Sequence, residues 1–79
     1  MKIKEKVYIV ATKDRKKIMK GLSKSIRFME DPSNNDRYTS VFSTRDSAER
    51  WILSGRVETL YPYTKKDLEI VETEAVYKL

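Results

Sequence analysis

The sequence of 79 residues contains no cysteine and no histidine. Without these residues the chain can form no disulfide, no thiolate or imidazole metal site, and no nucleophilic system that depends on Cys-His or Ser-His pairs. Serine and threonine residues are plentiful, but no histidine is available to activate their hydroxyl groups. We therefore expect a non-catalytic protein that uses no metal and no other cofactor.

Long hydrophobic runs are also missing. The most apolar run extends from Val7 to Ala11, which is too short for the core of a signal peptide or for a membrane span. The sequence therefore predicts a soluble, cytoplasmic protein that makes no membrane contact.

The chain has few residues from which to build a core. Hydrophobic residues make up 39% of the sequence and charged residues 37%, and a chain of this size buries only about 60% of the surface that its unfolded form exposes. We expect residues 1–79 to form a single small domain. Such a domain has little room for an enclosed active-site cavity, because a cavity removes packing contacts.

The positive charge is concentrated in the first third of the chain. Residues 1–27 carry ten basic and two acidic side chains, whereas residues 28–79 carry seven basic and ten acidic ones, so the two parts contribute +8 and −3 to the net charge of +5. This asymmetry indicates an anionic partner for the basic part. A basic strand lying beside an acidic strand of the same sheet would give the same pattern, so both interpretations stay open.

The clearest local pattern is an amphipathic helix within residues 43–55. Ala48, Trp51 and Ile52 have the spacing i, i+3, i+4, which places them on one apolar face that we assign to the core. Either Ser43 or Thr44 can cap its N-terminus. Gly55 is expected to end the helix in a left-handed conformation.

The other regular segments have the composition of β-strands. We expect a strand at 6–12, a charged turn, a strand over 17–29 with a bulge or kink at Gly21, a strand at 37–42, and a last strand at 68–77 with a bulge near residues 70–71. A helix within 17–29 is the alternative. The connection 56–66 is too apolar for a free linker and too irregular for a regular element. The predicted fold is α+β: a small antiparallel sheet of three to four strands with one helix, at about 44–54, packed on one face.

These segments together resemble a group of small uncharacterised proteins from Firmicute phages and prophages. The resemblance rests on a strand that ends at Phe42, on the helix pattern Thr-x-x-x-Ala-Glu-x-Trp-Ile at 44–52, and on the closing pattern Lys-x-Asp-Leu-Glu-Ile-Val at 65–71. It implies the same order of strands and helix, and a phage or mobile-element origin. It transfers no catalytic or binding residue.

Binding to a host or phage protein is our leading functional hypothesis. Small phage proteins of this kind resemble accessory or counter-defence factors that inhibit by covering a protein surface, and an exposed sheet edge can accept a partner strand or pair with a second copy to form a homodimer. The candidate contact residues are Leu53, Tyr61, Tyr63 and Tyr77, because aromatic and large apolar side chains dominate interface energies.

Nonspecific binding of nucleic acid is the alternative hypothesis. A basic N-terminal hairpin would gather Lys13, Arg15, Lys16, Lys17, Lys20, Lys24 and Arg27, which could attract a phosphate backbone. The same lysines could instead form a solvated face that prevents edge pairing.

Overall fold

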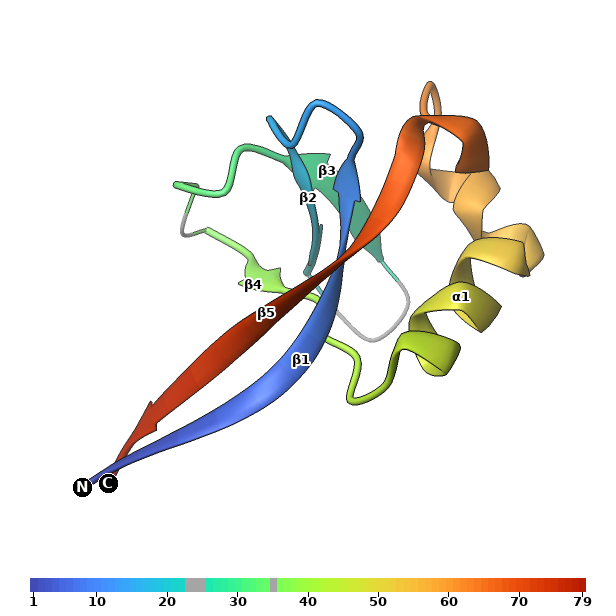
Figure 1. Cartoon of the computed structure of the whole chain (residues 1–79). Helices are drawn as coiled ribbons and strands as arrows, with labels where there is room; N and C mark the ends of the chain where they lie inside the picture. Colours follow the sequence, from blue (N-terminus) through green and yellow to red (C-terminus); the bar gives the residue numbers. More distant parts are fainter. Residues whose placement is uncertain (23–25, 35) are drawn as a thin grey trace.

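The protein is a five-stranded antiparallel sheet covered at one end by helices (Figure 1). The computed structural model describes residues 1–22, 26–34 and 36–79. The strands are β1 (Lys2–Thr12), β2 (Ile18–Gly21), β3 (Arg27–Glu30), β4 (Tyr38–Thr39) and β5 (Leu68–Lys78). The helices are α1 (Arg45–Leu53) and the 3-10 helices η1 (Gly55–Leu60) and η2 (Lys65–Asp67). The α+β class and the position of the α-helix are as predicted from the sequence.

The first and last strands form a long two-stranded ribbon. β1 and β5 pair along their whole length in a constant register, from Lys2 opposite Lys78 to Thr12 opposite Leu68. The expected bulge near residues 70–71 is therefore wrong. It was inferred because Glu69 lies on the opposite face from Glu72 and Glu74, but much of this ribbon lies outside the core, so both of its faces can carry charge.

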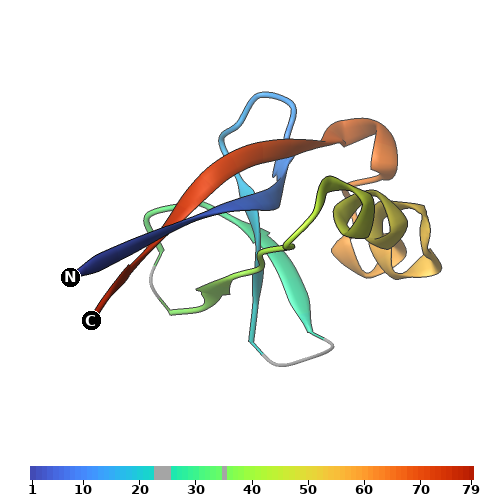
Figure 2. The ribbon, with the colours of Figure 1, turned by 60° about the horizontal axis from the view of Figure 1, so that its bottom comes forward.

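A short segment fills the gap where β1 and β2 diverge. These two strands pair only at Ala11 and Ile18. Farther along, Thr39 of β4 pairs with Lys20 of β2, and Phe42 exchanges backbone hydrogen bonds of 2.9 and 2.8 Å with Tyr8 of β1. Residues 38–42 thus run from one diverging strand to the other (Figure 2).

The strand order departs from the prediction between residues 17 and 42. The segment expected as one kinked strand, 17–29, forms two antiparallel strands, with Met19 of β2 opposite Met29 of β3. The part of this segment at 23–25 lies outside the described residues. The strand expected at 37–42 is reduced to the two residues of β4 and the bridge at Phe42, since it follows two different partners in turn.

The structure settles how the α-helix begins and corrects how it ends. Thr44 is the N-cap, and its hydroxyl accepts a hydrogen bond of 3.1 Å from the backbone N–H of Ser47. Gly55 is not left-handed: among the described residues only Arg15, with φ of 60°, has a positive φ. Ser54, which is extended with φ of −75° and ψ of 160°, instead ends α1 and caps η1, and its hydroxyl accepts a hydrogen bond of 3.3 Å from the backbone N–H of Arg56.

The core lies between the sheet and the helices. Val10, Met19, Leu60 and Leu68 are buried together, and Trp51 packs against them. Leu60 belongs to the connection that was expected to form no regular element, yet residues 55–60 form η1. In the described part of the chain, no helix is both long and apolar enough to cross a membrane.

The outer half of the ribbon extends away from this core. Residues Lys2 to Lys6 of β1 are all exposed, and the two chain ends lie side by side at the ribbon tip (Figure 1). This projection makes the molecule elongated, with principal extents of 40 × 27 × 25 Å.

Candidate functional site: a lysine groove beside the first turn

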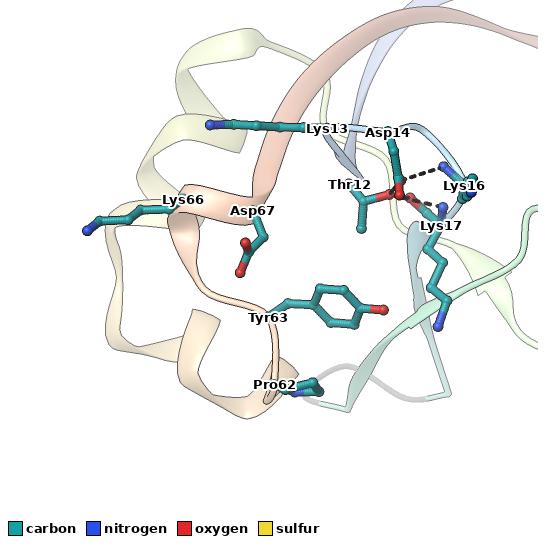
Figure 3. Close-up of a pocket in the computed structure, with 9 residues that line it drawn as sticks. All are labelled: Thr12, Lys13, Asp14, Lys16, Lys17, Pro62, Tyr63, Lys66 and Asp67. Atoms are coloured by element: carbon teal, nitrogen blue, oxygen red, sulfur yellow. Dashed lines mark hydrogen bonds between the residues drawn. The ribbon is translucent and has the colours of Figure 1, made fainter.

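A hollow of about 540 Å³ lies where the turn between β1 and β2 meets the segment that leads into β5 (Figure 3). We call it the lysine groove. Its lining residues come from two segments about fifty positions apart: Thr12, Lys13, Asp14, Lys16 and Lys17 from the turn, and Pro62, Tyr63, Lys66 and Asp67 from the second segment.

Thr12 and Asp14 hold the turn in shape. The Thr12 hydroxyl donates to the Asp14 carboxylate at 2.6 Å and accepts from the backbone N–H of Lys17 at 3.1 Å. The Asp14 carboxylate also accepts from the backbone N–H of Lys16 at 3.0 Å. These hydrogen bonds favour the ionised carboxylate and lower the pKa of Asp14. The lysines therefore project from a fixed backbone.

The opposite wall is built on a capping box. The Asp67 carboxylate accepts from the backbone N–H of Thr64 at 2.8 Å and from its hydroxyl at 3.1 Å, which lowers the pKa of Asp67. The backbone N–H of Lys13 donates to the carbonyl of Asp67 at 3.0 Å. This last bond ties the two walls together, so Lys66 keeps a defined position relative to the turn.

Tyr63 forms the floor of the groove. Its ring packs against the hydrophobic core, and its hydroxyl points toward the side chain of Lys17 (Figure 3). The Lys17 ammonium lies 5.6 Å from the ring centroid. The interaction with the Tyr63 side chain raises the pKa of Lys17 above its ordinary value.

The groove keeps an excess of positive charge. Its lining includes Lys13, Lys16, Lys17 and Lys66 against the two carboxylates of Asp14 and Asp67. Among the described residues none of these four lysines forms an ion pair, whereas Arg15 at the edge pairs with Glu69 at 2.8 Å. All four lysines are exposed, and Lys17 also interacts with the Tyr63 side chain.

The structure gathers only part of the basic set expected from the sequence. Lys13, Lys16 and Lys17 line the groove, and Arg15 lies beside it. Lys20 is 2% exposed and points to backbone carbonyls of the loop after β3, so it is not part of a surface. Lys24 lies outside the described residues.

Arg27 belongs to a different part of the surface. It is half-buried on β3, and its guanidinium lies 5.7 Å from the ring centroid of Tyr38. Sequence reasoning missed Lys66 and placed Tyr63 at a protein interface instead. The run Lys65-Lys66 was visible, but only the fold shows that η2 adjoins the first turn.

Two of the three glutamates of β5 pair with basic residues of the first third of the chain. Glu69 pairs with Arg15, and Glu72 lies 3.9 Å from Lys6. Neither carboxylate lines the groove. The last strand thus pairs with part of the basic N-terminal third, and the lysines of the groove lie outside these ion pairs.

The residues proposed for a protein interface are dispersed. Leu53 and Tyr61 are 74% and 88% exposed, and Tyr77 is exposed on the ribbon. Tyr63 is half-buried in the groove instead. Leu53 borders a second hollow of about 360 Å³, whose other lining residues include Ile52, Val57 and Tyr63.

No group of three or more His, Cys, Asp or Glu side chains that could hold a metal occurs within residues 1–22, 26–34 and 36–79. No family model, no curated protein and no solved structure matches the chain. The resemblance to small phage proteins stays a prediction.

Proposed function

We propose that this protein is a non-catalytic binding protein that holds the phosphate backbone of nucleic acid in the lysine groove. One observation carries the proposal: lysines from two distant segments line one hollow without ion pairs among the described residues. Like charges held together in this way repel one another, and phosphates would relieve that repulsion while releasing counterions.

The chemistry of the groove favours phosphate recognition over base recognition. Lysine ammonium groups act as flexible point charges, whereas base edges are usually read by bidentate groups. Arg15, the arginine beside the groove, is already bound to Glu69. We therefore expect the affinity for nucleic acid to depend strongly on salt concentration and only weakly on nucleotide sequence.

Fluorescence titration of labelled single-stranded and duplex oligonucleotides at several salt concentrations tests this proposal. Binding should weaken linearly in a log–log plot against salt concentration. Lys66→Ala should reduce the slope by about 0.7 for single strands and 0.9 for duplex, because one phosphate contact is lost.

Lys4→Ala is the matched control. Lys4 is an exposed lysine at the outer half of the ribbon, away from the groove lining, so its loss should leave the slope nearly unchanged. Equal effects of the two variants, or no binding of either oligonucleotide at low salt, would refute the proposal. Circular dichroism of each variant shows that the fold is retained.

Binding of a host or phage protein is a second candidate, and Leu53 supports it. A leucine so exposed at the border of a hollow that is partly lined by apolar residues can receive an apolar side chain from a partner. In this candidate the protein is a phage accessory or counter-defence factor that inhibits its partner by covering it. A pull-down from nuclease-treated lysate should then retain a protein with the wild type but not with Leu53→Asp, and equal retention by both would refute it.

A further inference from the structure

β5 is an edge strand whose outer side is open. The sheet order is β3-β2-β1-β5, and β5 pairs with β1 and with no other described strand. Such an edge presents a row of unpaired backbone groups that can pair with another strand.

The hydrogen-bond pattern identifies the open groups. The N–H of Leu79 donates to the carbonyl of Met1, and that of Lys13 donates to the carbonyl of Asp67, so the odd-numbered residues bond between β1 and β5. Because hydrogen-bonded and non-hydrogen-bonded pairs alternate in an antiparallel ladder, the even-numbered residues of β5 direct their N–H and C=O groups outward. These residues are Ile70, Glu72, Glu74, Val76 and Lys78.

The charges along this edge are complementary to those of a second, antiparallel copy of the same strand. Glu72, Glu74 and Lys78 lie on one face of the ribbon, with acidic residues at the centre of the strand and a basic residue at its end. We propose that a second copy of this chain pairs antiparallel with the outer edge of β5, around a two-fold axis at Ala75.

In this register, opposite charges face each other and the outward backbone groups form hydrogen bonds. Glu72 lies opposite Lys78 of the second copy, and the same contact occurs a second time by symmetry. The even-numbered residues form the hydrogen-bonded pairs, and the small side chain of Ala75 lies opposite its own copy at the axis. Thr73 lies opposite Tyr77 on the other face, which joins the exposed Tyr77 side chains into one surface across the dimer.

Neighbouring registers are less favourable. An axis at Glu74 places this carboxylate opposite its own copy, and an axis at Thr73 places Glu72 opposite Glu74, so both oppose like charges. An axis at Val76 pairs Glu74 with Lys78 but shortens the ladder. The register at Ala75 is thus the longest that opposes unlike charges.

The β1 edge of the ribbon cannot form an equivalent closed pair. The exposed part of β1 carries Lys2, Lys4 and Lys6, which would oppose one another in a symmetric pair. This edge is also interrupted at Tyr8, where Phe42 forms its bridge. Pairing of β1 with β5 of another copy would not close, and would give chains longer than a dimer.

A single introduced cysteine tests the position of the axis, because the natural chain has none. Opposed residues of a non-hydrogen-bonded pair lie with Cα atoms about 4.5 Å apart, within the range of a disulfide. Under mild oxidation Ala75→Cys should form a covalent dimer, whereas Thr73→Cys, opposed by Tyr77, should not. Failure of Ala75→Cys to cross-link, or stronger cross-linking of Val76→Cys or Thr73→Cys, would overturn the proposed register.

Charge exchange tests the pairing without cysteine. In sedimentation equilibrium of nuclease-treated protein, Glu72→Lys and Lys78→Glu should each weaken the dimer by about tenfold, since each change acts at two symmetric contacts. The double variant should restore it, and Glu58→Lys, an exposed position on η1, should have no effect. A wild type that stays monomeric at every concentration, a double variant that fails to recover, or assemblies longer than a dimer would refute the proposal.

Discussion

The ammonium group of Lys20 donates a hydrogen bond of 3.1 Å to the backbone carbonyl of Pro32. It also donates to the carbonyl of Asn34, so one buried lysine on β2 fixes the loop that follows β3. The same loop is fastened by the ion pair between Glu30 and Arg37, and the Arg37 guanidinium lies 4.2 Å from the ring centroid of Phe28. A residue that the sequence assigned to a binding surface thus serves the stability of the fold.

Replacement of Lys20 should therefore destabilise the protein. Lys20→Ala removes the packed aliphatic stem and leaves two loop carbonyls without their donor, which should lower the free energy of unfolding by about 2 kcal/mol or more. Lys20→Met keeps the stem and should cost less. Urea unfolding followed by Trp51 fluorescence measures both, and Lys16→Ala, an exposed lysine, should change stability by less than about 0.5 kcal/mol. An equally small effect of Lys20→Ala would contradict this role.

The two candidate caps of α1 can be separated by mutation. Thr44→Ala should lower the free energy of unfolding by about 1 kcal/mol, because the backbone N–H of Ser47 loses its acceptor. Ser43→Ala should have almost no effect, since the structure assigns it no capping bond. The same unfolding measurement compares them, and the reverse order would mean that the helix begins one residue earlier.

The core should respond to mutation as its burial predicts. Met19 is fully buried, so Met19→Ala should cost about 2–5 kcal/mol through lost transfer energy and a residual cavity. Leu53→Ala removes a side chain that is mostly exposed and should cost less than about 0.5 kcal/mol. Equal losses in thermal or urea unfolding would show that Leu53 packs more deeply than the structure indicates.

Acid should destabilise the fold through the groove carboxylates. Hydrogen bonds lower the pKa of Asp67 and Asp14 below their ordinary value of 3.8, so the folded state binds fewer protons than the unfolded state in this range. Their stabilisation is complete above that ordinary value and is lost as the pH falls through the lowered folded pKa.

Asp67→Asn tests this pH dependence. The plot of unfolding free energy against pH should be flatter below about pH 5 in the variant than in the wild type. Thr64→Ala should flatten it only in part, because the backbone N–H of Thr64, the larger cause of the lowered pKa, remains. Identical slopes in the wild type and Asp67→Asn would exclude a role for this carboxylate.

Local patterns predicted the parts of the fold that depend on near neighbours. The face formed by Ala48, Trp51 and Ile52 placed α1 correctly, and the charged run after β1 correctly predicted a turn. Gly21 was misinterpreted as a kink within one strand. In the structure Met19 of β2 pairs antiparallel with Met29 of β3, and residue composition does not reveal this reversal of the chain. The prediction of a bulge in β5 was wrong because the outer half of this strand lies away from the core. In that half, the alternation of apolar and polar residues does not indicate a buried face.

Composition and local spacing by themselves determined an α+β domain with a basic N-terminal third, a capped helix, and no thiol or imidazole chemistry. These features depend on residue type and on contacts within a turn or two. Only the tertiary structure decided which charges are free: it buried Lys20, tied Arg15 to Glu69, and brought Lys66 and Tyr63 to the first turn. Such choices arise from long-range strand pairing and desolvation, which a linear spacing of charges does not encode.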